Sequence, residues 1–149
     1  GAHQQPWTFC VVKDPDVKAR IRSLVEEEER LNYESRMSEE WKDELRPMIS
    51  GLHVGGHVEK PYLTDAPYVV VLMKRTYELD PLTEKRKTHY YVEKSCGICA
   101  GMFCAALHNA NLATLCSTPM HAEEGIRKLL GRPENERVYL LMPVGYPSE

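Results

Sequence analysis

The residues of this sequence that could do chemistry begin with an acidic run, Glu26 to Glu29, which is followed by Asn32 and Tyr33. Glu29 and Tyr33 are four positions apart, so on a helix both side chains project from one face. A carboxylate beside a phenol can bind an ammonium group. A run of charges on a helix is more commonly a solvated face, and the local pattern leaves both interpretations open.

A second motif, C-x-x-C, is formed by Cys96 and Cys99, and it is typical of a redox dithiol or of half a zinc site. Redox dithiols lie at a helix N-terminus, whereas this motif lies inside a helix expected to begin near Thr88. Cys104 and His108 do not complete a zinc site, because Cys96 and His108 are roughly 18 Å apart along a helix. We therefore predict that Cys96, Cys99 and Cys104 are packed core thiols and that no metal is bound.

Two further groups of polar residues carry a weaker signal. Lys60 stands in a glycine-rich stretch before Pro61, where a single lysine is usually solvated. Thr114, Ser117 and Thr118 flank a short apolar run. Hydroxyls at such a position are usually caps or turn formers, but at the end of a strand they can also contact a ligand. The types and spacing of these residues do not by themselves indicate a reaction.

The bulk composition limits the class of protein. The 149 residues, 42% of them hydrophobic, fit one domain over residues 1–149. A net charge of −3 gives no electrostatic footprint for nucleic acid. No apolar run reaches the roughly 18 residues that span a bilayer, and no signal peptide opens the chain, so we expect a soluble segment. The odd number of cysteines, five, favours reduced thiols over a disulfide framework.

Hydrophobic periodicity predicts the elements that position these residues. A helix begins at Asp14-Pro15, a capping residue followed by proline, and runs to about Met37. The segment 96–107 is apolar on every face, which predicts a buried helix. Strands alternating with helices indicate an α/β sheet covered by helices. The predicted strands are 8–13, 67–73, 112–116 and 138–144; the predicted helices are 14–37, 39–45, one within 89–110, and 120–130; 47–65 is a mobile loop and 74–87 a polar connection.

Four stretches carry a family resemblance: 1–9, with Pro-Trp-x-Phe; 14–33, with Glu-x-x-x-Tyr; 89–110; and 129–147, with Val-Gly-Tyr-Pro. Together they resemble the iodotyrosine deiodinase branch of the nitroreductase-like flavoproteins. The first and last elements are shared across that superfamily, and Glu-x-x-x-Tyr is specific to the branch. The resemblance implies an α+β nitroreductase-like fold, with a central mixed sheet packed by helices and incomplete at both termini.

The resemblance also implies a function. It points to an FMN-dependent oxidoreductase that removes iodide reductively from mono- or diiodotyrosine, giving tyrosine, by successive one-electron steps. FMN would bind at the interface of a homodimer, and NADPH would supply electrons through a partner reductase. Full-length members of the branch are membrane-anchored.

By the same resemblance, four residues would bind the halotyrosine. Glu29 would take its ammonium group, Lys60 its carboxylate, and Tyr33 would add a supporting hydrogen bond. The backbone N–H of Ala2 would face the phenolate oxygen. Residues 38–66 would form a lid over this substrate.

The cofactor would lie along Cys116, Ser117 and Thr118, with the catalytic Thr118 donating a hydrogen bond to the flavin N5. Cys116 is a departure, because the branch has threonine at this position and a thiol is a much weaker donor. The loop 53–58 is longer than the branch leads us to expect.

The resemblance implies that the arginine-rich segment that holds the FMN phosphate lies before residue 1, and that a further flavin-contacting arginine lies beyond Glu149. The nearest candidates here, Arg132 and the start of the helix near Met120, do not form a clamp, so residues 1–149 alone are expected to bind FMN weakly. Two alternatives stay open. One is a nitro- or quinone-type FMN reductase that transfers hydride, and the other is a non-catalytic truncated product that cannot hold FMN.

Overall fold

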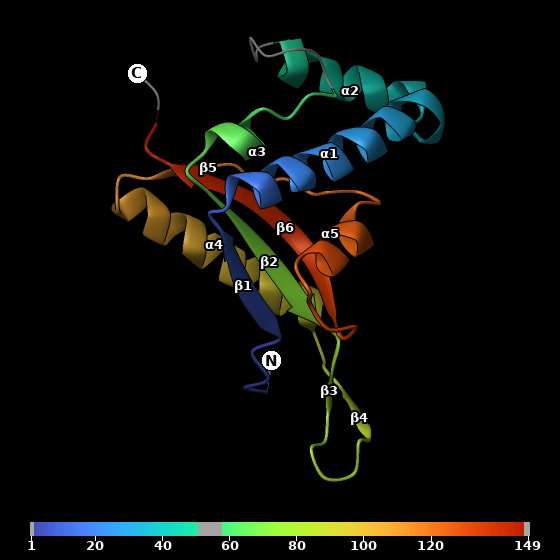
Figure 1. Ribbon diagram of the computed structural model, residues 1–149, viewed down its shortest axis with the longest axis vertical. Coiled ribbons are helices and arrows are strands. Elements are labelled where there is room, and N and C mark those ends of the chain that lie inside the picture. Colours follow the sequence, from blue (N-terminus) through green and yellow to red (C-terminus); the bar gives the residue numbers. More distant parts are fainter. Residues whose placement is uncertain (1, 51–57, 148–149) are drawn as a thin grey trace.

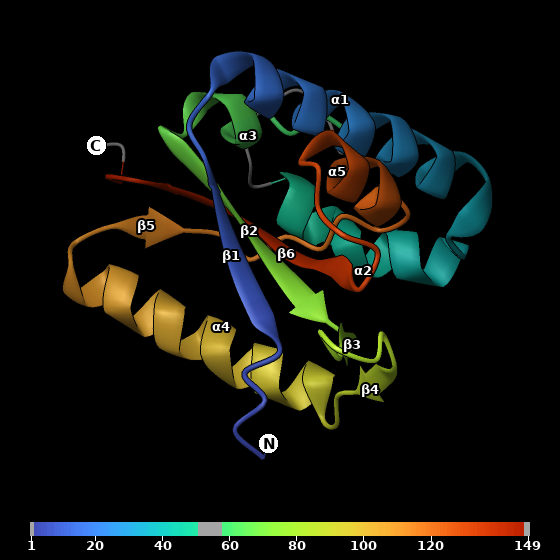
Figure 2. The same cartoon turned by 60° about the horizontal axis from the view of Figure 1, so that its bottom comes forward.

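The computed structural model describes residues 2–50 and 58–147, with the side chains of 47–50 also left aside. Helices lie on both faces of a four-stranded sheet, so the chain forms three layers (Figures 1 and 2). The sheet order is β1-β2-β6-β5. The strands are β1 (Trp7–Val12), β2 (Tyr68–Arg75), β5 (Ala113–Thr114) and β6 (Glu136–Gly145).

The central strand β2 is buried on both of its faces. Val69, Val71 and Met73 pack in one apolar cluster with side chains of α1 (Pro15–Leu31), α3 (Tyr62–Asp65) and α5 (Glu123–Leu129). Val70 and Leu72 pack in a second cluster with α4 (Val92–Asn109). This explains why the sequence of β2 is a continuous apolar run rather than an alternating one, and it confirms the strand predicted at 67–73.

Helix α1 is fixed at its start and along its length. The Asp14 side chain accepts hydrogen bonds from the backbone N–H groups of Asp16 at 2.9 Å and Val17 at 3.0 Å, as the N-cap prediction requires. The buried Lys18 donates from Nζ to the carbonyls of Thr64 at 3.2 Å and Ala66 at 2.7 Å. Carbonyls at a helix end lack intrahelical partners, so this lysine both satisfies them and ties α3 to α1.

The prediction of one α-helix to Met37 is wrong in its last turn. After Leu31 the chain continues as a π turn, η1 (Asn32–Arg36), in which the N–H of Met37 donates to the carbonyl of Asn32 at 2.9 Å. The side chain of Asn32 is buried and accepts from Arg36 Nη1 at 3.0 Å. Helix α2 (Glu39–Ser50) then runs past the end expected at residue 45.

The prediction that the helix over 96–107 is buried all round is also wrong. In α4 the side chains of Ile98 and Met102 are 67% and 70% exposed. The helix starts at Val92 rather than near Thr88, because Tyr91 has a left-handed backbone with φ of 53°. One apolar face of α4 packs on the sheet, and the other faces away from it (Figure 2).

Short elements account for the remaining differences. The polar connection 74–87 contains most of a hairpin of β3 (Tyr77–Leu79) and β4 (Arg86–Thr88), and the expected loop contains α3. The α+β fold class is confirmed, and the strand pairs among the described residues are all antiparallel. No described helix is long and apolar enough to cross a membrane.

A buried carboxylate joins the two strands that flank β2. Glu136, at the start of β6, accepts from Thr8 Oγ1 on β1 at 2.9 Å. It also receives two bonds from Arg132, from Nε at 2.7 Å and from Nη2 at 2.9 Å. Burial alone would raise the pKa of Glu136, but the hydrogen bonds from Arg132 and Thr8 outweigh it and hold that pKa below its ordinary value.

We predict that Glu136 makes stability depend on acid pH. A carboxyl whose pKa is lowered by folding stabilises the fold above its unfolded pKa, near 4.5, and this contribution is lost as pH falls through the folded pKa. Glu136→Gln should lower the free energy of unfolding at pH 7 by about 1.5–3 kcal/mol. It should also flatten the decline of stability below about pH 4.5. Urea denaturation of both proteins across pH 3–7 measures this, and parallel pH profiles would contradict it.

Candidate functional site

Two residues singled out in the sequence form an ion pair in the structure. Lys60 Nζ lies 3.0 Å from Glu29 Oε1, and the two side chains are 16% and 22% exposed. Glu29 lies in the last turns of α1, and Lys60 directly precedes α3. A carboxylate and an ammonium group are therefore held side by side at one place on the molecule. Partial burial makes their interaction stronger than that of a fully solvated pair.

Glu26 fixes the backbone that carries Lys60. Its Oε1 accepts from the Lys60 N–H at 2.7 Å and from Arg22 Nε at 2.6 Å. Arg22 in turn donates from Nη1 to Thr64 Oγ1 at 2.9 Å. In the sequence Glu26 is one residue of the acidic run, and that pattern did not predict this role. The only local signal was the spacing of Arg22 and Glu26, four positions apart on one helix face.

Tyr33 lies in the π turn next to the charged pair. Burial, and then the nearby charge of Glu29, raise the pKa of Tyr33. The phenol therefore stays protonated at neutral pH and can donate a hydrogen bond.

Tyr62 connects the charged pair to the segment that follows β5. Its hydroxyl lies 3.4 Å from Ser117 Oγ. Burial raises the pKa of Tyr62, the hydrogen bond with Ser117 opposes this rise, and the charges of Glu29 and Glu26 add to it. The sequence analysis did not single out Tyr62.

The segment Cys116–Thr118 is fixed on the sheet by its middle residue. The backbone of Ser117 donates to Leu141 on β6 at 2.9 Å and accepts from it at 2.8 Å. Cys116 and Thr118, on either side, are exposed. The segment thus presents two exposed side chains on a rigid backbone.

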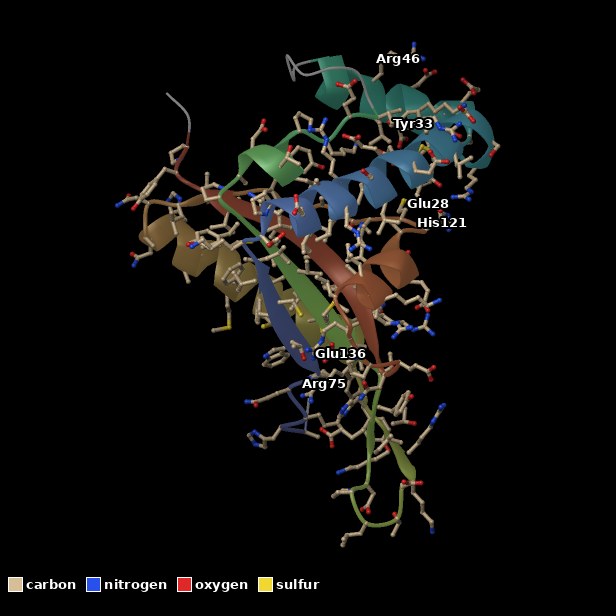
Figure 3. All side chains as sticks on the ribbon, in the orientation of Figure 1. Glu28, Tyr33, Arg46, Arg75, His121 and Glu136 are labelled. Atoms are coloured by element: carbon tan, nitrogen blue, oxygen red, sulfur yellow. The ribbon has the colours of Figure 1, made fainter. Side chains whose placement is uncertain are left out.

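Ala2 is not brought near Glu29 within one chain. The N-terminal segment is joined to Arg75, which donates from Nη2 to the carbonyl of Gln5 at 2.9 Å. In Figure 3, Tyr33 lies near the top of the molecule, whereas Arg75 lies beside Glu136 at the lower end of the sheet. Ala2, with φ of 50°, therefore lies far from the charged pair of its own chain.

Arg132 and the start of α5, the two candidates for holding a phosphate, are poorly suited to bind one. Arg132 is paired with the Glu136 carboxylate through Nε and Nη2, which neutralises most of its charge toward another anion. Helix α5 opens with Glu123 and Glu124, and carboxylates in a first turn repel an anion from the N-terminus. Along the ranges 2–50 and 58–147, no three His, Cys, Asp or Glu side chains are grouped to hold a metal ion.

The C-x-x-C cysteines do not form a reactive pair. Cys96 is buried, its Sγ donates to the Pro6 carbonyl at 3.3 Å, and burial raises its pKa to about 11. This confirms Cys96 as a packing residue. Cys99 is half-buried beside an apolar groove of about 490 Å³, and Cys104 is half-buried further along α4. The other side chains that line the groove are Trp7, Phe9, Ser95, Ile98, Met102 and Phe103.

The profile of the nitroreductase family matches residues 1–146, so the chain belongs to the nitroreductase family. Among its relatives, an iodotyrosine deiodinase from Drosophila melanogaster is 46% identical over 149 residues, which is 100% of this chain and 50% of the relative. An iodotyrosine deiodinase from Haliscomenobacter hydrossis is 47% identical over 149 residues, which is 100% of this chain and 64% of the relative.

A solved structure shows the same relationship in three dimensions. The crystal structure of oxidized iodotyrosine deiodinase bound to FMN and 3-iodo-L-tyrosine superposes with a TM-score of 0.77 and 28% identity. The match covers 100% of this chain and 71% of that one. The chain thus has the nitroreductase-like fold, and it spans 50% and 64% of the lengths of the two relatives above.

We predict that Glu26 holds the Lys60 segment by its charge as well as its shape. Glu26→Ala removes the acceptor for Lys60 N–H and for Arg22, and it should lower the free energy of unfolding by about 1–3 kcal/mol. Glu26→Gln keeps one acceptor oxygen and should cost less. The measurement is urea denaturation followed by circular dichroism.

The matched control is Glu27→Ala in the same run. Among the described residues, the ion pair of Glu27 is with the exposed Arg30, at 2.8 Å, and its removal should change stability by no more than about 0.5 kcal/mol. If Glu26→Ala and Glu27→Ala lowered the free energy of unfolding equally, the contact of Glu26 with the Lys60 N–H would not stabilise the fold.

Proposed function

We propose that the whole protein is an FMN-dependent oxidoreductase that removes halide reductively from iodotyrosine. The observation that carries the proposal is the Glu29–Lys60 pair at 3.0 Å, in a chain whose relatives are named iodotyrosine deiodinases. An amino acid carries one ammonium and one carboxylate. A site that presents one anion and one cation at a single place matches that zwitterion.

Substrate binding exchanges one ion pair for two. Glu29 would leave Lys60 and accept from the ligand ammonium, while Lys60 would donate to the ligand carboxylate. Charge-assisted hydrogen bonds of this kind contribute about 1.5–3 kcal/mol each. The protonated Tyr33 adds a donor to the same place. We propose that residues 38–66 close over the ligand and exclude water. Of these residues, 51–57, with Gly55 and Gly56, lie outside the described part of the chain.

Cys116, Ser117 and Thr118 would contact the isoalloxazine ring. Their rigid backbone and two exposed side chains fit a role in positioning a flat ring, and the Thr118 hydroxyl can donate to N5. When bound and reduced, FMN supplies the electrons that replace the carbon–iodine bond by a carbon–hydrogen bond. Among the described residues, no group of cationic side chains is arranged to bind the FMN phosphate. We therefore propose that residues outside the described part of the protein bind this phosphate. An NADPH-dependent reductase is the proposed source of electrons.

A second copy of the chain would complete the site. Ala2, the proposed donor to the phenolate, lies far from Glu29 of its own chain, so one ligand can meet both only if two copies contribute. The exposed side of α4 offers the surface for that contact. Gly97, Gly101 and Ala105 recur every four residues there, beside Ile98 and Met102, and such small residues let two helices approach closely.

The substrate proposal is tested with Glu29→Gln in the FMN-loaded full-length protein. Binding of iodotyrosine, followed by flavin fluorescence, should weaken about 10- to 150-fold, equivalent to one charge-assisted bond. Binding of an uncharged iodophenol should barely change, because it has no ammonium group. Glu27→Gln serves as the control and should alter neither ligand. Equal weakening for both ligands would favour the alternative of a nitro- or quinone-type reductase.

The dimer proposal is tested with Gly101→Gln. Nothing lies within 4 Å of a Cβ built at Gly101, so the change should leave the fold intact and add up to about 1 kcal/mol of helix stability. It should nevertheless separate the copies, as seen by sedimentation of the full-length protein. Leu82→Gln removes a side chain that is 93% exposed on the β3–β4 hairpin and should leave the dimer unchanged. A dimer that survives Gly101→Gln would place the contact elsewhere.

A further inference from the structure

Two cysteines that are distant in sequence meet in the structure. Cys104, on α4, has its Sγ 3.6 Å from the Sγ of Cys116, which follows β5 by two residues. Both are free thiols; Cys116 is exposed and Cys104 is half-buried. The sequence analysis singled out the C-x-x-C motif instead, and the structure brings together a different pair.

The backbones on both sides of this contact are held in place. Ser117, next to Cys116, exchanges both of its backbone hydrogen bonds with Leu141. Cys104 packs in the same apolar cluster as Leu107 and Leu112, which lie at the end of α4 and just before β5. The two thiols are therefore presented to each other by fixed elements. A disulfide bond needs about 2.05 Å, so the sulfurs must approach by about 1.5 Å, which rotation of the exposed Cys116 side chain can supply.

We propose that Cys104 and Cys116 form a site of reversible oxidation, which closes to an intramolecular disulfide when the protein meets hydrogen peroxide. Burial and the neighbouring Cys104 raise the pKa of Cys116, so its thiol first gives up a proton to form a minor thiolate fraction. The thiolate attacks one peroxide oxygen and the O–O bond breaks, giving a sulfenic acid and a hydroxide that takes up the released proton as water. The Cys104 thiol then displaces the sulfenic oxygen, which leaves as a second water, and the S–S bond forms. Two thiols lose two electrons and two protons, and one peroxide becomes two waters.

The disulfide would tie the segment Cys116–Thr118 to α4. That segment is the one proposed to contact the flavin, and α4 is the helix proposed to meet a second copy. The inference itself does not depend on the proposed function, because it rests on the contact between the two sulfurs.

The test exposes the reduced, folded protein to hydrogen peroxide, blocks the remaining thiols with an alkylating reagent, and maps linked peptides by mass spectrometry without reduction. Among the five cysteines of residues 1–149, we expect the free thiols to fall from five to three, with one cross-link joining Cys104 to Cys116. A reducing thiol should restore all five. In urea-unfolded protein the same treatment should link cysteines without this preference.

Two single variants keep the result unambiguous. Cys104→Ser and Cys116→Ser should each abolish the internal link. Cys104→Ser should leave Cys116 as an unresolved sulfenic acid, whereas Cys116→Ser should keep its four remaining thiols. A cross-link from Cys96 to Cys99, links between copies, or over-oxidation of Cys116 without any link to Cys104 would overturn the proposal.

Discussion

The rest of the structure depends on the burial of β2 on both faces. Val71 and Leu72 are adjacent in sequence, point to opposite sides of the sheet, and are both fully buried. Burying a side chain of this size contributes about 1.5–3 kcal/mol, so a few such residues hold both helical layers. The layer with α1 and α3 positions the Glu29–Lys60 pair. The layer with α4 meets Cys116 from the other side. One strand thus sets the relative position of the two halves of the proposed site.

The long elements could be predicted because their hydrophobic period is sustained over several turns. The β3–β4 hairpin could not be predicted, since each of its strands has only three residues, too few to show a hydrophobic period. Helix α4 shows a different limit. Its composition correctly indicated an apolar helix, but composition cannot distinguish a side that packs on its own sheet from one left for another surface, as at Ile98 and Met102.

The proposed site was predictable only in part. Glu29 and Lys60 were each unremarkable by local pattern, and only the family resemblance joined them. Glu26 and Tyr62 escaped because their contacts are made to a backbone N–H 34 residues away and to a hydroxyl 55 residues away. The residue types at positions 26 and 62 do not indicate which distant groups their side chains contact. Charge and hydrophobic periodicity indicate whether a residue is buried and in which element it lies. A long-range hydrogen bond such as that of Glu26 or Tyr62 depends on how the elements pack in the folded chain.

The π turn after Leu31 has a consequence for how the length of this chain can vary. A π turn closes its hydrogen bond over five residues where an α-helix uses four, so it holds one residue more than the helix around it needs. Deleting a single residue between Asn32 and Arg36 would restore a regular helix rather than break it. Because the π turn takes up the extra residue within a single wide turn, the segment after the deletion would keep nearly the same direction about the helix axis. This turn is therefore a place where the chain can gain or lose one residue while α2 keeps its direction.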